Sequence, residues 1–126
     1  MTKACESDSN ERRFDLEERT AQFGEAVVEF AKTVPVNPVT GVLIPKLVKA
    51  ATSVGANYCE ADDAGSKKEF RYRISICKRE SRESKHWLRM VAKAVAELKE
   101  PARTLWQEAK ELNLIFAAIH QGRGRS

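Results

Sequence analysis

A four-three rhythm of apolar and small residues runs through residues 66–98 and most constrains the fold of this 126-residue chain. Residues three and four positions apart lie on one face of an α-helix, so this spacing predicts a long amphipathic helix. Ser66 and Glu69 form an S-x-x-E capping box, which places the start of that helix at Ser66. The positions that share the face are Phe70, Ile74, Cys77, Ser81, Ser84, Leu88, Val91, Val95 and Leu98.

Two further helices are predicted before this segment. The first runs from about Asp15, which can cap it, to Val34, because the prolines that follow disfavour helical angles in the residues before them. The second begins between Thr40 and Pro45 and continues to about Asp62. A late start or a kink at Pro45 is favoured, because proline is tolerated best in the first turn of a helix.

A fourth helix is expected after the long one, with Pro101 in its first turn and its end near Gly122. Four such helices with short connections predict an all-α, antiparallel up-down-up-down four-helix bundle. Gly55 costs about 1 kcal/mol relative to alanine inside a helix, which indicates close approach of a neighbouring backbone. The expected domains are a disordered lead over residues 1–13, the bundle over 14–121 and a disordered basic tail over 122–126.

Electric charge is distributed unevenly, although the net charge is only +4. Residues 66–93 hold ten Lys or Arg against three Glu, whereas the segment before residue 32 is rich in Asp and Glu. Winding the long helix at about 100° per residue places Glu69, Glu80, Glu83 and Trp87 on one flank of its apolar face. Seven cations fall on the other flank: Lys67, Arg71, Lys78, Arg82, Lys85, Arg89 and Lys93.

The basic flank contains like charges at i,i+4, such as Lys67 with Arg71 and Lys85 with Arg89. Each such pair costs roughly a few tenths of a kcal/mol, so we expect a partner that offsets the repulsion. A nucleic acid would do so through phosphate contacts and counterion release. A second copy of the chain would also do so, since opposite charges on the two flanks allow head-to-tail contact and a closed ring. A solvated face without a partner is the third alternative.

Recognition of particular bases is not indicated by any motif in the sequence. No helix-turn-helix, zinc knuckle or RNP aromatic pair is present. Few aromatic residues are expected at the surface, so stacking on unpaired bases is poorly supported. The basic flank therefore predicts contacts to the nucleic-acid backbone alone.

Catalytic and metal-binding motifs are weak. Glu83-x-x-His86 is the repeated unit of di-iron bundles, but Ala117 stands where a second motif at His120 would need its Glu. No phosphate-binding glycine loop, nucleophile elbow or informative Cys–His spacing appears. We therefore expect no enzyme activity, no metal and no cofactor.

The remaining chemically distinctive residues have ordinary interpretations. Cys5, Cys59 and Cys77 lack CxxC spacing and are interpreted as reduced thiols. No apolar run could span a bilayer, and the N-terminus lacks the apolar stretch of a signal peptide, so a cytoplasmic location is expected. A solvated end of the second helix explains its acidic cluster, Glu60, Asp62 and Asp63.

Five stretches carry a family resemblance: FDLEERT, TSVGANYCEA, SKKEF, KRESRESKHWL and EAKELNLIFAAI. Over roughly Phe14 to His120 the chain resembles the four-helix-bundle family encoded within intervening sequences of bacterial large-subunit (23S) ribosomal RNA genes. That family also includes relatives of the accessory variability protein of diversity-generating retroelements. The resemblance implies a homopentameric ring. Its retroelement relatives imply basic surfaces that bind nucleic acid and a reverse transcriptase, whereas most members have no established activity.

Carried over by position, the family motif implies structural or interface roles for ten residues. They are Ser53, Gly55, Ala56, Asn57, Glu60, Ser66, Phe70, Glu80, Glu83 and Trp87. The chain departs from the family pattern at His86, where a Tyr is usual, at Pro45, where a helix former is usual, and at Lys78, where an apolar residue is usual. Lys78 enlarges the basic flank.

The leading hypothesis is a non-catalytic, ring-forming bundle whose basic flank binds RNA or DNA backbone without sequence readout. The alternative is a protein–protein adaptor or assembly scaffold, in which the charges serve the ring or an acidic protein partner. The first predicts nucleic-acid binding that weakens steeply with salt. The second predicts little affinity for nucleic acid and a salt-sensitive oligomer.

Overall fold

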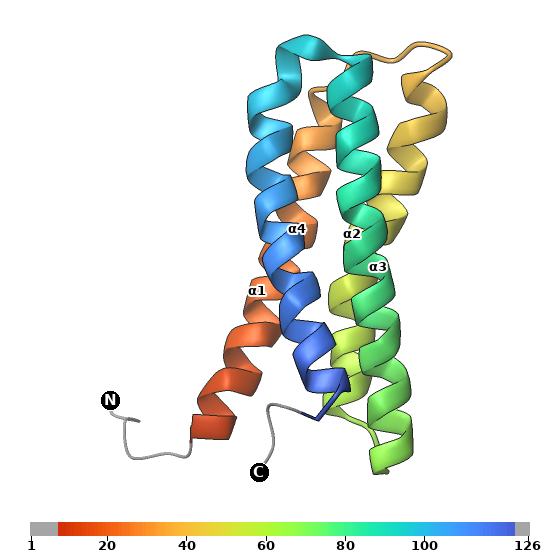
Figure 1. Ribbon diagram of the computed structural model, residues 1–126. Coiled ribbons are helices and arrows are strands. Elements are labelled where there is room, and N and C mark those ends of the chain that lie inside the picture. The colour runs from red at the N-terminus through yellow and green to blue at the C-terminus, as the bar shows by residue number, and fades with distance from the viewer. Residues whose placement is uncertain (1–7, 123–126) are drawn as a thin grey trace.

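The computed structural model describes residues 8–122, with side chains from Asp15 onward, and consists of four α-helices and one short 3-10 helix. The elements are α1 (Asp8–Lys32), α2 (Thr40–Asp62), α3 (Lys67–Ala94), η2 (Ala96–Leu98) and α4 (Lys99–His120). Successive helices run antiparallel, and the described part of the chain contains no strand (Figure 1). The predicted all-α four-helix bundle is confirmed.

The four helices form two layers. α1 packs against α2, α2 against α3 and α3 against α4, whereas α1 meets α4 over a much smaller contact. In Figure 1, α3 and α4 lie in front of α1 and α2. The face made by α1 and α2 is therefore opposite the face made by α3 and α4.

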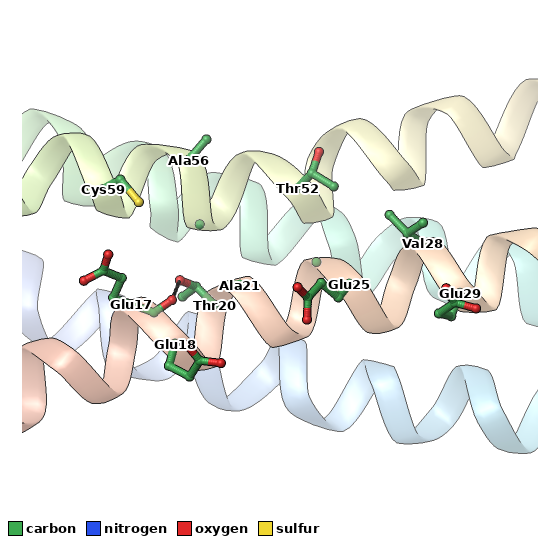
Figure 2. A pocket seen from close by; sticks show the side chains of 12 residues that line it. Glu17, Glu18, Thr20, Ala21, Glu25, Val28, Glu29, Thr52, Ala56 and Cys59 are labelled. Carbon is green, nitrogen blue, oxygen red and sulfur yellow. Dashed lines mark hydrogen bonds between the residues drawn. The ribbon is translucent and has the colours of Figure 1, made fainter.

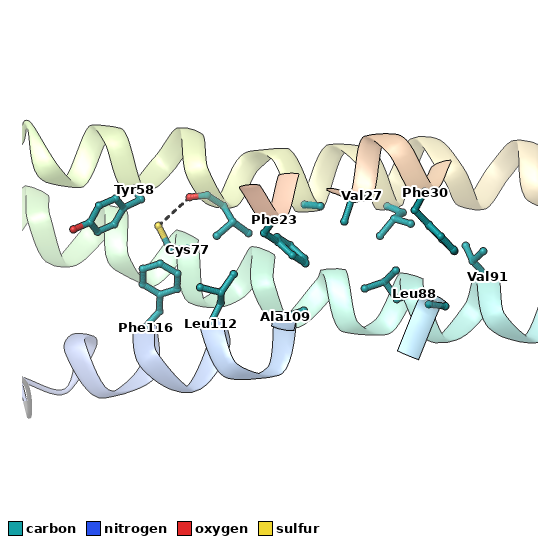
Figure 3. Close-up of a cluster of buried hydrophobic side chains, with 14 of the residues drawn as sticks. Phe23, Val27, Phe30, Tyr58, Cys77, Leu88, Val91, Ala109, Leu112 and Phe116 are labelled. Atoms are coloured by element: carbon teal, nitrogen blue, oxygen red, sulfur yellow. Dashed lines mark hydrogen bonds between the residues drawn. The ribbon is translucent and has the colours of Figure 1, made fainter. Parts of the chain in front are cut away.

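The core is built from the apolar face of every helix. Phe23 and Val27 of α1, Leu88 of α3 and Leu112 and Phe116 of α4 are almost fully buried and meet between the two layers (Figure 3). Burying one such side chain is worth about 1.5–3 kcal/mol. The heptad positions named from the sequence thus supply the core.

Three small polar residues of the heptad face are also fully buried in α3. Ser81 and Ser84 donate their hydroxyl hydrogens to the carbonyls of Lys78 and Glu80 one turn earlier, so burial leaves neither hydroxyl unpaired. The Cys77 thiol lies 3.5 Å from the Val54 carbonyl, and burial raises its pKa to about 12. Cys77 is therefore a neutral thiol at physiological pH.

Two helix starts differ from the expectation. α1 begins at Asp8, so Asp15 lies inside the helix and does not cap it. α2 begins at Thr40, the early end of the expected range, so the favoured late start is wrong and Pro45 lies in the second turn rather than the first. The physical reason for this start is Asn37, whose Oδ1 accepts hydrogen bonds of 2.9 Å from both Val39 N and Thr40 N.

The connection between α3 and α4 also differs. α3 ends at Ala94 instead of running to residue 98, because Val95 adopts a φ of −133° and a ψ of 88° that no α-helix accommodates. η2 then leads into α4, with Pro101 in the first turn as predicted. The predicted lead and tail fall partly on residues 1–7 and 123–126, which lie outside the described residues.

Two local predictions from the sequence are confirmed. Ser66 caps α3 by accepting a 3.1 Å hydrogen bond from Glu69 N, and the Glu69 side chain reaches back to Gly65 N at 3.3 Å. Gly55 lies against α1, because a Cβ added there would stand 3.3 Å from Thr20 Oγ1 and 3.4 Å from the Thr20 carbonyl carbon. The close approach of backbones at Gly55 is therefore real.

Candidate nucleic-acid interface

Several cations of the basic flank, here called the basic stripe, lie beside α4. Arg71 donates to the carbonyl of His120 at the end of α4. Lys85 Nζ stands 5.6 Å from the ring centroid of Trp106 of α4, and Arg89 lines a groove together with that ring. The basic stripe consists of Lys67, Arg71, Lys78, Arg82, Lys85, Arg89 and Lys93.

α4 continues the basic surface with residues that the sequence reasoning missed. Lys99 and Arg103 line the same groove as Arg89, and Lys110 Nζ lies 5.6 Å from the Trp106 centroid. A signal was present, since residues 99, 103, 106 and 110 follow four-three-four spacing and so share one flank of α4. Which neighbour that flank would face could not be read from the spacing.

Few cations of the described residues are paired with a carboxylate. Arg19 bonds Glu108 and Glu111, each at 2.7 Å, and Arg79 lies 3.3 Å from Glu80. None of the seven stripe cations forms a salt bridge with a carboxylate of residues 15–122. Their charge is therefore available to an external anion.

The charges at one end of the basic stripe affect the pKa of His120. Burial lowers the pKa of His120 below its usual value, and the charges of Arg71 and Lys78 lower it further. The hydrogen bond from Arg71 also satisfies a carbonyl at the C-terminus of α4, where a cation is stabilising. This end of the α3–α4 face is positive even where no ligand is bound.

The acidic flank of α3 faces α2, where cations meet it. Glu80, Glu83 and Trp87 line a groove with Lys46 and Lys49 of α2, and Lys46 Nζ lies 5.6 Å from the Trp87 ring centroid. This flank is thus partly matched within the chain. It is a weaker candidate for contact with a second copy than the sequence suggested.

A stronger acidic surface lies between α1 and α2, on the opposite side of the bundle from the basic stripe. Glu17, Glu18, Glu25 and Glu29 of α1 line one side of a groove of about 570 Å³, and the whole lining contains no Lys or Arg (Figure 2). Cys59 also lines this groove, where burial and the nearby carboxylates raise its pKa. Acidic and basic surfaces therefore occupy opposite faces of one molecule.

The family-motif residues make contacts within the bundle. Asn57 donates to the Ser53 carbonyl at 3.0 Å and accepts from Arg73 at 3.0 Å, which ties α2 to α3. Ala56 lines the α1–α2 groove, and Phe70 packs against the core. Ser66 and Gly55 act as the cap and the close-packing position described above, and Glu60 is exposed.

The Glu83–His86 pair lies away from any cluster of possible metal ligands. His86 is exposed and packs edge-on against Trp87, with ring centroids 4.8 Å apart. No group of three or more His, Cys, Asp or Glu residues in the described part of the chain could hold a metal ion. Within the same residues, no helix is both long and apolar enough to cross a membrane.

The fold and its charge pattern define the class as an antiparallel four-helix bundle with one acidic and one basic face. The chain belongs to the family of 23S rRNA-intervening sequence proteins, which it matches over residues 12–118. The described residues also superpose, with a TM-score of 0.78 and 21% sequence identity, on a crystal structure from Bacteroides thetaiotaomicron described as a protein of unknown function from the S23 ribosomal protein family. That match covers 86% of this chain and 97% of the other. Comparison with curated proteins found no match.

Proposed function

We propose that this protein is a non-catalytic helical bundle that binds the backbone of RNA or DNA through the basic stripe, without sequence readout. The observation that supports this proposal most is that seven cations gather on one flank of α3 and that none of them pairs with a carboxylate of residues 15–122. A helix that holds like charges at i,i+4 without internal compensation is stabilised by an external polyanion.

The length of the basic stripe suits a nucleic acid. From residue 67 to residue 93 the α-helix rises about 40 Å, slightly more than one turn of B-form duplex at about 34 Å. Lys99, Arg103 and Lys110 widen the surface across α4. Several phosphates of one or two strands can therefore be neutralised at once.

Charge reversal within the basic stripe tests the proposal. Fluorescence anisotropy would compare the wild-type protein with a variant carrying Arg71→Glu, Arg82→Glu and Arg89→Glu, using a labelled structured RNA and a DNA duplex. The matched control carries Lys32→Glu, Lys49→Glu and Arg79→Glu and has the same net charge. Affinity lost only in the stripe variant supports the proposal. Equal losses in both variants, with helicity retained, contradict it.

A second candidate function is assembly of the chain with itself or with an acidic protein. The acidic α1–α2 groove supports it, because that groove and the basic stripe lie on opposite faces and complement each other in charge. Contact between unlike faces of successive copies builds a ring when the rotation closes. We propose a homo-oligomer of this kind, with a pentamer favoured. An acidic protein or a reverse transcriptase is the corresponding external partner.

A further inference from the structure

Trp106 lies in the middle of the basic surface and is partly buried between α3 and α4. The groove beside it has a volume of about 290 Å³, just below the usual range for ligand pockets. Its walls carry Arg89 from α3 and Lys99 and Arg103 from α4, and no carboxylate lines it. Proteins that bind single strands combine a positively charged groove with aromatic rings on which bases stack.

We propose that this groove holds one unstacked base of a single-stranded nucleic acid against Trp106, with the adjoining phosphates on Arg89, Lys99 and Arg103. The inference rests on the proposed function and makes it more specific. It assigns a preference for single-stranded segments, loops or bulges to a surface that would otherwise bind any polyanion.

The ring of Trp106 is partly exposed, and two ammonium groups lie near it. Lys85 and Lys110 each place Nζ 5.6 Å from its centroid. A stacked base contributes more than an exposed cation–π contact does. A base can therefore displace one ammonium group, which then remains close enough to pair with a phosphate.

The floor of the groove also suits a base. Leu88 is fully buried, and Ala92 and Ala102 present small apolar side chains beside the ring. Gln107 at the same groove offers both a donor and an acceptor, so it does not select one base edge. A duplex keeps its bases stacked on one another, so it gains nothing from Trp106.

The first test leaves the protein unchanged and alters the ligand. Affinity would be measured at about 50 mM salt for a ten-nucleotide oligouridylate, for the same strand carrying abasic sites, and for a duplex of equal length. Abasic sites keep the phosphates and remove the bases. The proposal predicts binding about tenfold weaker for the abasic strand.

The second test determines whether the base stacks on Trp106. The chain has two tryptophans, so the Trp87→Phe variant reports on Trp106 alone and the Trp106→Phe variant reports on Trp87 alone. Oligouridylate should quench the fluorescence of Trp106 with saturation and leave that of Trp87 nearly unchanged. Trp106→Phe should keep most of the affinity, because it keeps an aromatic ring. Trp106→Leu should lower the affinity for the single strand about tenfold and the affinity for the duplex only slightly.

The outcomes separate this inference from the proposed function. Equal affinity for intact and abasic strands, with binding still lost in the stripe variant, overturns the base site and leaves backbone binding in place. Absence of binding to every ligand at the lowest salt overturns both. A loss of affinity when the bases are removed, together with quenching confined to Trp106, supports both the base site and backbone binding.

Discussion

His120 is the residue whose titration reports most directly on the basic stripe. Its pKa lies below the usual 6.5, first because it is partly buried and then because Arg71 and Lys78 repel the imidazolium. A phosphate bound beside these cations would favour the charged imidazole and raise the pKa. An NMR titration should therefore give a value below 6.5 for the free protein and a higher value with saturating structured RNA.

Removing Arg71, one of the two cations near His120, is the control for this titration. Arg71→Gln should raise the pKa of His120 in the free protein, since one repulsive charge is gone. In the wild type the unfolded chain binds this proton more readily than the folded chain, so the free energy of unfolding should fall as the pH drops below about 6.5. A His120 pKa that does not respond to RNA would place the phosphates elsewhere.

Two glycines in the α1–α2 layer should respond differently to the same substitution. A Cβ at Gly24 would meet only ordinary contacts, the nearest being Thr52 Cα at 3.6 Å. Gly24→Ala should therefore raise the free energy of unfolding by about 0.5–1 kcal/mol through helix propensity. At Gly55 the Cβ would crowd Thr20, so Gly55→Ala should give no net gain. Urea unfolding of both variants measures this, and equal stabilisation would contradict the close packing at Gly55.

At the scale of helices, Arg19 joins the pair with the smallest contact, α1 and α4. Its guanidinium bonds Glu108 at 2.7 and 2.9 Å and Glu111 at 2.7 Å, and these carboxylates raise its pKa. The Arg19 and Glu108 side chains are 29% and 31% exposed, so solvent screens the pair in part. Arg19→Met should lower the free energy of unfolding by about 1 kcal/mol.

A double-mutant cycle isolates this link between α1 and α4. Glu108→Gln alone and Glu108→Gln with Arg19→Met would be unfolded in urea beside the single Arg19 variant. The expected result is a coupling energy of at least about 0.5 kcal/mol. Strictly additive effects would mean that the Arg19–Glu108 pair does not help to hold α1 against α4.

The rhythm of apolar residues predicted the existence of all four helices but not all of their ends. Heptad spacing reports which residues face a core, and it continues past the true end of α3 because Val95 and Leu98 also contact the core. Val95 leaves the helix by its backbone angles, which spacing does not encode. Similarly, Asn37 starts α2 through a side-chain hydrogen bond that outweighs the preference of Pro45 for the first turn.

At the scale of the whole molecule, the separation of charge onto opposite faces favours assembly. If the acidic α1–α2 groove of one copy meets the basic stripe of the next, sedimentation should show a species larger than the 14.2 kDa chain. A pentamer would be five times that mass. Glu17→Lys with Glu25→Lys should shift the population toward smaller species, because both carboxylates line the groove. An unchanged distribution would exclude the groove from the interface.

The basic stripe was predictable from sequence because it lies on one helix, whereas the full interface was not. Trp106 and its neighbouring cations belong to another helix, and only the packing of α4 beside α3 brings them to Lys85 and Arg89. The carboxylates of the acidic groove all lie on α1 and were visible in the sequence, but the sequence did not show that α2 forms the other side of the groove. Surfaces shared between helices depend on their mutual rotation, which a single sequence leaves open.

The central claim is that the basic stripe binds phosphates, and the salt dependence of affinity tests it most directly. Affinity of the wild-type protein for a structured RNA would be measured by anisotropy from about 50 to 200 mM salt. Several simultaneous phosphate contacts predict a linear fall of log affinity with log salt and a slope steeper than about −3. An affinity that does not change with salt, or no binding at the lowest salt, would contradict the claim. The seven cations would then have to be explained by contacts between proteins.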